Sequence, residues 1–256
     1  MDPAALAGIV LCFVCIMVST IMEGGSPMSM LKIPAIILVF GGTIGACLAS
    51  GMLKDTIGAV KAAIAALTAK AIDSNGVVDD IVKLAERARR EGLLALEDAS
   101  KDIDNDFLKK GLQMAIDGTD PDELREILEA EITAKKGGDK ASKNWFNDAG
   151  AYGPTIGIIG TVMGLVHVLE NLDKPETLGE SISGAFIATL WGVCSANVLW
   201  FPIGKRIARI SELQCAEMEL VVEGILAIQA GSNPRVVAQK LKSLLPGGGE
   251  VEKKAA

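Results

Sequence analysis

The distribution of charge along this chain limits its possible folds more than its composition does. Four stretches contain no Asp, Glu, Lys or Arg, and they cover residues 4–22, 33–53, 149–169 and 181–204. A helix needs roughly 20 mainly apolar residues to cross a hydrocarbon core of about 30 Å. Because lipid offers the backbone no hydrogen-bond partners, such stretches must form helices. We therefore expect four transmembrane helices, in preference to the buried core helices of a soluble protein.

The first stretch has one alternative, a secretory signal peptide. A signal peptide begins with a basic region and ends at a small-residue cleavage site. Only Met1 and Asp2 precede Pro3, and no cleavage site followed by a soluble domain is apparent. We expect a retained membrane helix.

The placement of Lys and Arg predicts the orientation in the membrane. The two short segments 23–32 and 170–180 hold one Lys each, and the other basic residues lie in the middle segment and the C-terminal tail. Cytoplasmic loops carry the excess of Lys and Arg. We expect both termini and the middle segment to be cytoplasmic and two short loops to face outward, in a multi-pass protein of the inner membrane.

Charge and cysteine content exclude some functions. A net charge of −7 argues against nucleic-acid binding. Cys12 and Cys15 have the spacing of a CxxC motif, but they lie at lipid depth without other ligands. We interpret them as apolar filling and expect no metal site and no cofactor.

The middle segment is predicted to be helical. Apolar residues recur at helical spacing over 77–88, and a second helix is expected over 105–116. Asp120 and the proline after it form a helix start, with Asp120 as the cap. We expect Gly137 and Gly138 to break this third helix before the third span.

The last part of the chain continues the fourth span. Its apolar stripe extends as a helix to about Gln229, a short helix follows over 235–245, and the Gly- and Lys-rich tail from residue 247 has a disordered composition. Strand-like alternation is absent. The predicted class is an all-α integral membrane protein with four transmembrane helices and a helical cytoplasmic domain. The expected parts are the first two spans, the cytoplasmic domain, the last two spans, and a cytoplasmic helix with a flexible tail, at 1–53, 54–148, 149–204 and 205–256.

The third span carries a stripe of glycines, Gly153, Gly157, Gly160 and Gly164. Glycine stripes let membrane helices approach closely. The stripe could form an oligomer or pore wall, or it could pack within the chain, and the sequence does not choose between them. Two threonines lie at comparable depth, Thr161 in the third span and Thr189 in the fourth. Each could bond its own helix or face a wet cavity.

Two prolines lie in or near the spans, and the spans contain no acidic residue. Pro154 and Pro202 each free a backbone carbonyl, so they can act as hinges or as static bends. No Asp or Glu lies in any span, and His167 is the only histidine, near the end of the third span. Ion movement through a membrane normally uses an intramembrane carboxylate or a comparable polar site. If this chain conducts ions, another chain must supply the carboxylate.

The cytoplasmic segment holds a charged cluster around the apolar run 93–96. Arginines precede the run and acidic residues follow it. The cluster is either a solvated face or a contact surface for a charged partner. No P-loop, GxSxG or His/Glu metal-binding spacing is present, so we do not expect an enzyme.

Several motifs together resemble the MotA/PomA family of flagellar motor stator subunits, over nearly the whole chain. They lie at 24–26 (GGS), 40–43 (FGGT), 88–97 (ARREGLLALE), 153–165 (GPTIGIIGTVMGL), 188–192 (ATLWG), 201–203 (FPI), 223–229 (EGILAIQ) and 233–235 (NPR), together with Asn197. The motif of the third span alone is also similar to TolQ and ExbB, which have three spans and lack this charged segment.

The resemblance implies a mechanism. Five copies of this subunit would surround two copies of a single-span MotB/PomB-type partner whose membrane Asp binds protons or sodium ions. The ion cycle would drive the ring around the partner against the rotor protein FliG. Rotor contact is implied for Arg89 and Glu97, with Arg90 and Asp98 assisting. Pro154 and Pro202 match prolines of the conformational step, and Thr161 and Thr189 match positions near the ion path.

One departure bears on the ion. Sodium-driven relatives usually have a threonine where this chain has Ala188, and a missing hydroxyl removes one candidate sodium ligand. We expect protons, with sodium as the alternative. An ExbB/TolQ-like energiser of an envelope complex is the alternative function. A substrate transporter would show inverted repeats and polar residues within its spans, and we see neither.

Overall fold

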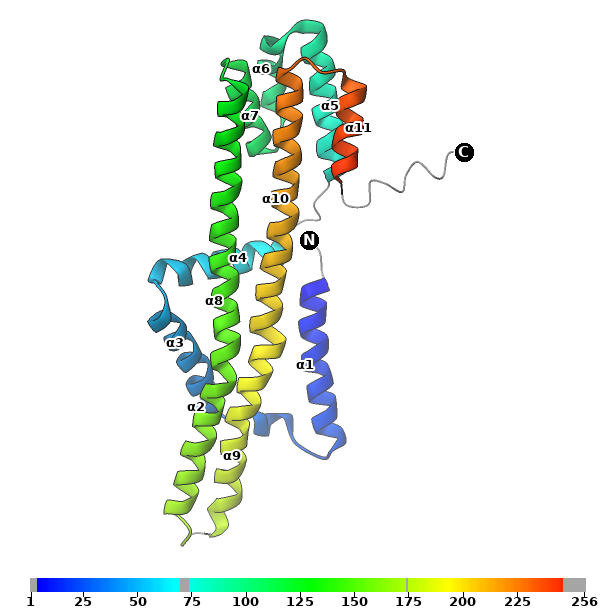
Figure 1. Cartoon of the computed structure of the whole chain (residues 1–256). Coiled ribbons are helices and arrows are strands. Elements are labelled where there is room, and N and C mark those ends of the chain that lie inside the picture. The colour runs from blue at the N-terminus through cyan, green and yellow to red at the C-terminus, as the bar shows by residue number, and fades with distance from the viewer. Residues whose placement is uncertain (1–3, 70–73, 174, 246–256) are drawn as a thin grey trace. The chain divides into compact units, whose positions relative to one another are not determined.

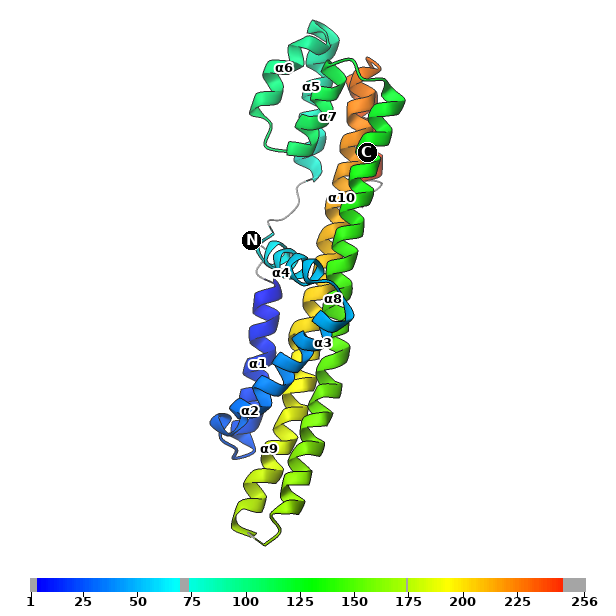
Figure 2. The ribbon, with the colours of Figure 1, turned by 90° about the vertical axis from the view of Figure 1, so that its left-hand side faces the viewer.

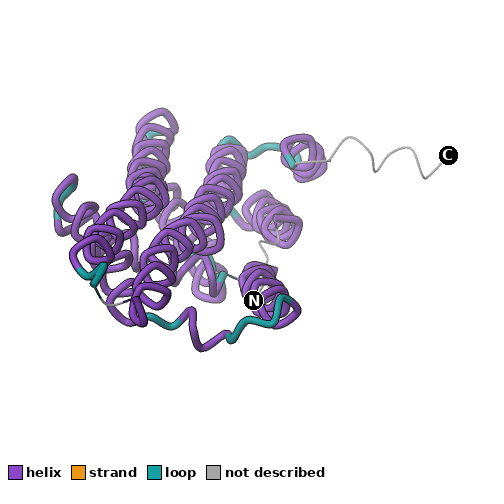
Figure 3. The backbone as a smooth tube through the Cα atoms, turned by 90° about the horizontal axis from the view of Figure 1, so that it is seen from below, coloured by secondary structure: helices purple, strands orange, loops and turns teal. Residues whose placement is uncertain are grey.

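The computed structural model describes residues 4–69, 74–173 and 175–245, and every regular element in these ranges is helical (Figures 1 and 3). The chain divides into two compact units. Unit 1 comprises Met1–Lys70 and Gly138–Ile210, and unit 2 comprises Ala71–Gly137 and Ser211–Ala256. The predicted tail from residue 247 lies outside the described residues.

Unit 1 contains the helices that can cross a membrane. Four helices of the described chain are long and apolar enough to do so. This confirms the predicted class, an all-α integral membrane protein with four transmembrane helices. The elements that begin in unit 1 are α1 (Ala4–Met22), a 3-10 turn (Pro27–Met30), α2 (Ile33–Ile36), a π-helical turn (Ile37–Gly41), α3 (Gly42–Ser50), α4 (Leu53–Thr68), α9 (Pro175–Cys194), a second π-helical turn (Ser195–Trp200) and α10 (Phe201–Gln229).

Helix α8 (Pro121–Glu170) is one continuous helix, so the predicted break at Gly137 and Gly138 is wrong. Each glycine costs a helix only about 1 kcal/mol relative to alanine. Strong helix formers surround the pair, and a Cβ at either glycine would meet no atom within 4 Å. The helix therefore passes through both positions.

Helix α4 runs across α8 and α10 within unit 1 (Figures 1 and 2). Its inner face is made of alanines, of which Ala59, Ala63 and Ala66 pack with the aromatic rings of Trp145 and Phe146. The Trp145 indole Nε1 donates a hydrogen bond to Thr56 Oγ1 at 3.0 Å. The opposite face of α4 exposes a helical stripe of large apolar side chains, Leu53, Ile57, Val60 and Ile64. Such a helix suits the plane of a membrane interface.

Unit 2 is built around a core of aliphatic side chains. Its remaining elements are α5 (Ser74–Glu91), a 3-10 turn (Leu93–Ala95), α6 (Leu96–Ala99), another 3-10 turn (Ser100–Asp102), α7 (Asp106–Ile116) and α11 (Pro234–Leu244), with parts of α8 and α10. The largest fully buried side chains of this core are Val78, Ile81, Leu96, Leu108, Leu112, Leu124, Leu128, Val221, Ile225, Val237 and Leu241.

The ends of these helices follow local sequence rules. Asn105 caps α7 by accepting a hydrogen bond from the Leu108 backbone N–H at 3.0 Å. The Asp120 carboxylate, the predicted cap of α8, accepts from the Asp122 N–H at 2.9 Å. Helix α10 ends at Gln229 as predicted. The predicted division into four parts was based on the charge pattern along the chain, whereas the two units are defined by compactness. The four-part division stays a prediction.

Candidate functional site

The glycine stripe of α8 packs against α9 within the chain. A Cβ at Gly157 would lie 2.8 Å from the Ala188 carbonyl oxygen, and a Cβ at Gly164 would lie 2.5 Å from Ala185 Cβ. Real Cβ atoms do not come this close, so these positions require glycine. The stripe brings the backbones of α8 and α9 into contact. Of the two interpretations left open by the sequence, intramolecular packing is the one observed.

This close approach brings Thr161 and Thr189 together. Their hydroxyl groups are in direct hydrogen-bond contact. The Thr161 hydroxyl also lies 3.1 Å from the Ala185 carbonyl oxygen, and both hydroxyls lie 3.2 Å from the Gly157 carbonyl oxygen. Four oxygen atoms thus converge between two membrane helices, and both threonine side chains remain partly exposed.

The cluster has limited proton chemistry of its own. Two hydroxyls supply two donors, and the two carbonyls and the hydroxyls themselves supply the acceptors. No carboxylate takes part, and among the described residues no group of three or more His, Cys, Asp or Glu side chains could hold a metal ion. The arrangement can donate and accept hydrogen bonds to water or to a passing ion, but it has no titratable group that could hold a proton or balance a full charge.

Ala188 faces away from this cluster. Its side chain is buried with Ala35 and Ile187, and a Cβ on Gly160 would lie only 2.7 Å from Ala188 Cβ. Together with His167, Ala188 lines a cavity of about 410 Å³ among α2, α8 and α9. The candidate ion-path positions therefore occupy two faces of α9: Thr189 meets Thr161, and Ala188 meets α2.

Neither candidate proline interrupts its helix. Helix α8 continues through Pro154, whose Cα would lie 3.2 Å from a Cβ on Gly192. Pro202 is the second residue of α10, two residues after the end of the π-helical turn Ser195–Trp200. Proline has no N–H to bond the carbonyl four residues earlier, and a π turn changes the hydrogen-bond register locally. The conformational role of both prolines stays a prediction.

Sequence reasoning missed a buried polar group beside Pro154. The Thr43 hydroxyl of α3 is fully buried and has no hydrogen-bond partner among the residues that the structure describes. A Cβ on Gly153 would lie 3.8 Å from Thr43 Oγ1 and 3.4 Å from Ser195 Oγ, so both hydroxyls border the same gap. In the sequence, Thr43 is the last residue of the FGGT motif at 40–43. Its polarity in an apolar span was the available signal.

The four predicted rotor-contact residues lie in unit 2 and are all exposed. Arg89 and Arg90 occupy the last turn of α5, and Glu97 and Asp98 lie in α6. Between them Gly92 adopts φ +86°, a left-handed conformation that suits glycine and turns the chain from one helix to the next.

The charged residues at this turn differ in their ion-pair partners. Lys101 donates to the Asp98 carboxylate at 2.8 Å, and this hydrogen bond lowers the pKa of Asp98. Glu91, between the two pairs, accepts from Arg87 at 3.3 Å. Leu94 is 75% exposed amid the charges, although its neighbour Leu96 in the same apolar run is fully buried. The surface therefore combines both signs of charge with one apolar side chain, as protein contact surfaces do.

A second charged group in unit 2 joins three helices. Glu223 of α10 accepts from Arg125 of α8 at 2.8 Å and from Lys240 of α11 at 2.5 Å. The hydrogen bond from Lys240 and then that from Arg125 hold the pKa of Glu223 below its ordinary value. Glu223 thus ties α11 to α10 and α8, next to the buried Val237 and Leu241 of α11.

The fold and the hydroxyl cluster define a class: a polytopic helical membrane protein with an oxygen-lined contact between two spans and a separate charged helical unit. Residues 99–220 match the model of the MotA/TolQ/ExbB proton channel family. Motility protein A of Bacillus subtilis is 36% identical over 248 residues, with 96% of this chain and 92% of the relative covered. Chemotaxis protein PomA of Vibrio alginolyticus is 33% identical, with 96% of each chain covered.

Solved structures agree with these relatives. The chain matches the structure of C. jejuni MotAB with a TM-score of 0.91 and 30% identity, over 96% of each chain. It matches the flagellar MotAB stator complex from Bacillus subtilis with a TM-score of 0.89 and 34% identity, over 99% of this chain and 100% of the other. The chain belongs to the MotA/PomA family of flagellar motor stator subunits, as the sequence motifs predicted.

Proposed function

We propose that this protein is the ion-conducting, torque-generating subunit of a flagellar motor stator. The observation that carries the proposal is the Thr161–Thr189 hydroxyl pair at the contact of α8 and α9. It is a polar site at membrane depth that lacks a carboxylate of its own. Such a site can guide an ion only together with a charged group from another chain.

The missing carboxylate comes from a single-span partner of the MotB/PomB type. Two solved structures that this chain resembles contain MotA together with MotB. In the proposed complex five copies of this subunit surround two copies of the partner, and the partner's Asp loads and releases ions beside the threonine pair. The exposed apolar residues of α8, Ile158, Ile159, Val162 and Met163, are suited to contacts with lipid or with other chains of such a ring.

Unit 2 delivers the torque in this proposal. Arg89, Arg90, Glu97 and Asp98 lie exposed at the turn between α5 and α6 and present both signs of charge. A charged face of the rotor protein FliG would pair with them during each step. The positive-inside pattern supports the required orientation in the inner membrane, with unit 2 and both termini in the cytoplasm.

We propose protons as the ion. Ala188 offers no hydroxyl, and its side chain is buried against α2 and α8. A sodium ion needs several oxygen ligands to replace its water, whereas a proton can pass along hydroxyls and water. Each charge that crosses 100 mV releases about 2.3 kcal/mol, so one revolution under load needs many ions.

Swimming speed tests this function. A non-motile strain without stator subunits receives this chain with its partner, and sodium is varied at fixed pH. We expect speed that ignores sodium and collapses with a protonophore. Speed that rises with sodium would overturn the choice of ion but keep the stator. No swimming, with the complex present in the membrane and a chimeric partner tested, would contradict the stator function.

A further inference from the structure

The gap bordered by the Thr43 and Ser195 hydroxyls lies where three elements of unit 1 meet. Thr43 belongs to α3, Gly153 belongs to α8, and Ser195 is the first residue of the π-helical turn that follows α9. The side chains of Thr43 and Ser195 are buried, with their residues 0% and 2% exposed. Neither hydroxyl takes part in the Thr161–Thr189 pair.

Thr43 does not use the acceptor that a helical threonine commonly has. A threonine hydroxyl inside a helix can bond the carbonyl oxygen four residues earlier, which here belongs to Val39. Val39 lies in the π-helical turn Ile37–Gly41, where the hydrogen-bond register is shifted. The Thr43 hydroxyl bonds neither Val39 nor any other residue that the structure describes. A buried hydroxyl without a partner is costly, so this group requires one from elsewhere.

Three oxygen atoms surround the gap. They lie close to the position that a Cβ on Gly153 would occupy: the Gly192 carbonyl oxygen at 3.2 Å, Ser195 Oγ at 3.4 Å and Thr43 Oγ1 at 3.8 Å. The Ser195 hydroxyl donates to the Gly192 carbonyl oxygen at 3.0 Å. Because a hydroxyl oxygen also has two lone pairs, Ser195 can still accept a hydrogen bond while it donates this one.

These features fit a buried water molecule. Such a water needs a space of about its own size and two to four polar partners. Gly153 has no side chain, which leaves room on this side of α8, and the three oxygen atoms supply the partners.

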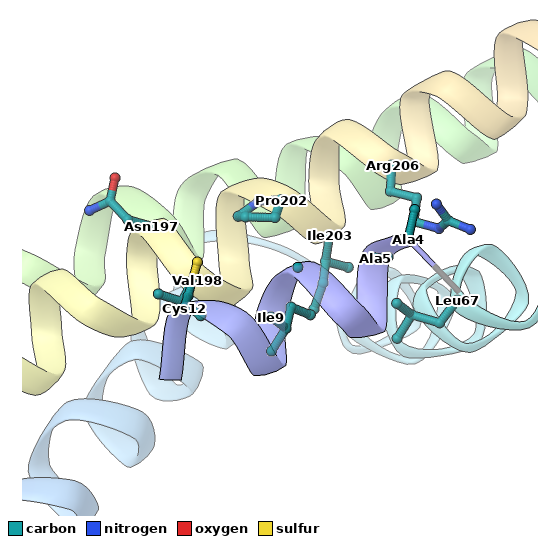
Figure 4. Close-up of a pocket in the computed structure, with 11 residues that line it drawn as sticks. Ala4, Ala5, Ile9, Cys12, Leu67, Asn197, Val198, Pro202, Ile203 and Arg206 are labelled. Atoms are coloured by element: carbon teal, nitrogen blue, oxygen red, sulfur yellow. The ribbon is translucent and has the colours of Figure 1, made fainter. Parts of the chain in front are cut away.

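A larger cavity of unit 1 has a different chemistry. It measures about 430 Å³ and lies between α1 on one side and α4 and α10 on the other (Figure 4). Two polar side chains that line it, Asn197 and Arg206, donate to the carbonyl oxygens of Val193 and Ala66, each at 2.9 Å. Both groups have partners, whereas the Thr43 hydroxyl has none among the described residues. The gap beside Gly153, and not this cavity, therefore requires a polar ligand.

We propose that the gap binds one water molecule, which joins α3 to the contact of α8 and α9. The water accepts a hydrogen bond from the Thr43 hydroxyl and donates one to the Ser195 hydroxyl, and its second hydrogen faces the Gly192 carbonyl oxygen. Buried waters make about three such bonds. The bridge satisfies the Thr43 hydroxyl and holds α3 against the other two helices.

This water site is separate from the Thr161–Thr189 pair. Gly153 lies about one helical turn before Gly157, whose carbonyl oxygen the two threonines share. Between the two sites a Cβ on Gly192 would lie 3.2 Å from the Gly157 Cα and 2.7 Å from the Gly153 carbonyl oxygen. The backbones touch there and leave no room for a water. The proposal does not depend on the stator function, because its residues all belong to one chain and its tests need no ion flux.

A high-resolution cryo-EM map of this chain in complex with its single-span partner tests the site. We expect a peak of density within about 2.5–3.0 Å of both hydroxyl oxygens, the range of O–H···O hydrogen bonds. No peak, in a map that shows other buried waters, would overturn the proposal. A peak that is present in sodium buffer and absent in potassium buffer would also overturn it, because it would indicate a bound cation.

The sign of the effect of Thr43→Val separates a hydrated gap from a dry one. This variant keeps the shape of the side chain and removes its hydroxyl. If water is bound, the variant removes the donor to that water, and the midpoint of thermal unfolding of the complex should fall by about 2–4 °C. A rise would overturn the proposal, because removing an unpartnered buried hydroxyl from a dry gap is stabilising. Thr155→Val, at an exposed position of α8, is the matched control and should leave the midpoint unchanged.

A double-mutant cycle with Ser195→Ala tests whether the two hydroxyls act through one water. If they share it, either single variant already disrupts the bridge, so the double variant should lower the midpoint by less than the two single falls added together. Additive falls would contradict a shared water. If Thr43→Val does not assemble with the partner, the map of the wild-type complex alone decides.

Discussion

The Thr161 hydroxyl on α8 is in direct hydrogen-bond contact with the Thr189 hydroxyl on α9, and both share the Gly157 carbonyl oxygen. The two threonines are 28 residues apart in sequence. They meet because Gly157 has no side chain to keep the two helices apart. The polar cluster and the glycine stripe are thus one structural feature: the stripe sets the helix separation that lets the hydroxyls meet.

Replacing either hydroxyl by a methyl group should impair ion passage. Thr161→Val and Thr189→Val keep the side-chain shape, but they remove a donor and leave the Gly157 and Ala185 carbonyl oxygens with fewer partners. A lost hydrogen bond at a partly buried site costs about 1–3 kcal/mol, so ion flux should fall about tenfold. Proton uptake into vesicles that carry the assembled complex measures this change.

Thr155→Val is the matched control in the same helix. Its side chain is exposed, and its hydroxyl donates to the Tyr152 carbonyl oxygen at 2.8 Å, one turn away in the same helix. We expect near-wild-type flux from Thr155→Val and substantial recovery in Thr161→Ser, which keeps the hydroxyl. Equal flux in Thr161→Val and Thr155→Val would show that the pair is only a packing contact.

The spans could be predicted from the sequence because lipid imposes a simple rule on charge. Helix α1 has the predicted bounds, 4–22, and the second span is shorter than predicted, since α3 ends at Ser50 before α4 begins at Leu53. The depth of Thr161 and Thr189 in the membrane could also be predicted, from the place of each residue within its span. Their mutual contact was not, because it depends on the rotation of two helices about their axes.

Other features depend on contacts that no local pattern encodes. The Trp145 indole reaches Thr56 across 89 residues and helps hold α4 against α8. The two π-helical turns lie in stretches with ordinary apolar composition. The predicted break at Gly137 and Gly138 was wrong because the helix-breaking tendency of a glycine pair is outweighed here by the helix formers around it.

Adding one methyl group to the glycine stripe should separate α8 from α9. In Gly157→Ala the new Cβ would lie 2.8 Å from the Ala188 carbonyl oxygen, which is backbone and cannot move aside easily. Overpacking of this kind costs about 1–3 kcal/mol. Thermal unfolding of the purified complex should show a lower midpoint for Gly157→Ala than for wild type. Gly184→Ala in α9 has open space at its Cβ and should be neutral; equal midpoints for the two variants would contradict close packing at Gly157.

Charge reversal at the turn between α5 and α6 should uncouple the motor without closing the channel. Arg89→Glu and Glu97→Lys change exposed side chains, so assembly and ion flux should stay at wild-type levels. A like-charge contact that costs about 1 kcal/mol reduces productive engagement about fivefold. Swimming speed, measured beside ion flux in the same cells, separates the two effects.

Lys109→Glu changes an exposed side chain of α7 in the same unit; it controls for a general change of charge and should swim normally. A FliG variant with the opposite reversal should restore swimming to Arg89→Glu but not improve wild type. If Lys109→Glu and Arg89→Glu lose motility equally, the effect is one of net charge and the proposed contact surface is wrong.

Glu223 should hold α11 in place above the pH at which its carboxylate gains a proton. Its pKa is held below the ordinary value of 4.5, chiefly by the hydrogen bond from Lys240. A carboxylate whose pKa is lower in the folded protein than in the unfolded chain stabilises the folded state. This stabilisation is complete above the pKa of the unfolded chain and is lost as the pH falls through the pKa of the folded protein. Glu223→Gln should therefore weaken α11 at neutral pH by about 1–2 kcal/mol, since its side chain is partly exposed.

Hydrogen exchange of peptides from α11 in the intact complex measures this effect. A loss of about 1–2 kcal/mol corresponds to about 5–30-fold faster exchange in Glu223→Gln than in wild type at neutral pH. Comparison of the two proteins at the same pH removes the intrinsic pH dependence of exchange, and the ratio should fall towards one below pH 4.5. Glu126→Gln, an exposed carboxylate on α8, should leave exchange unchanged. A ratio for Glu223→Gln that stays constant down to low pH would show that α11 is held by Val237 and Leu241 and not by the carboxylate.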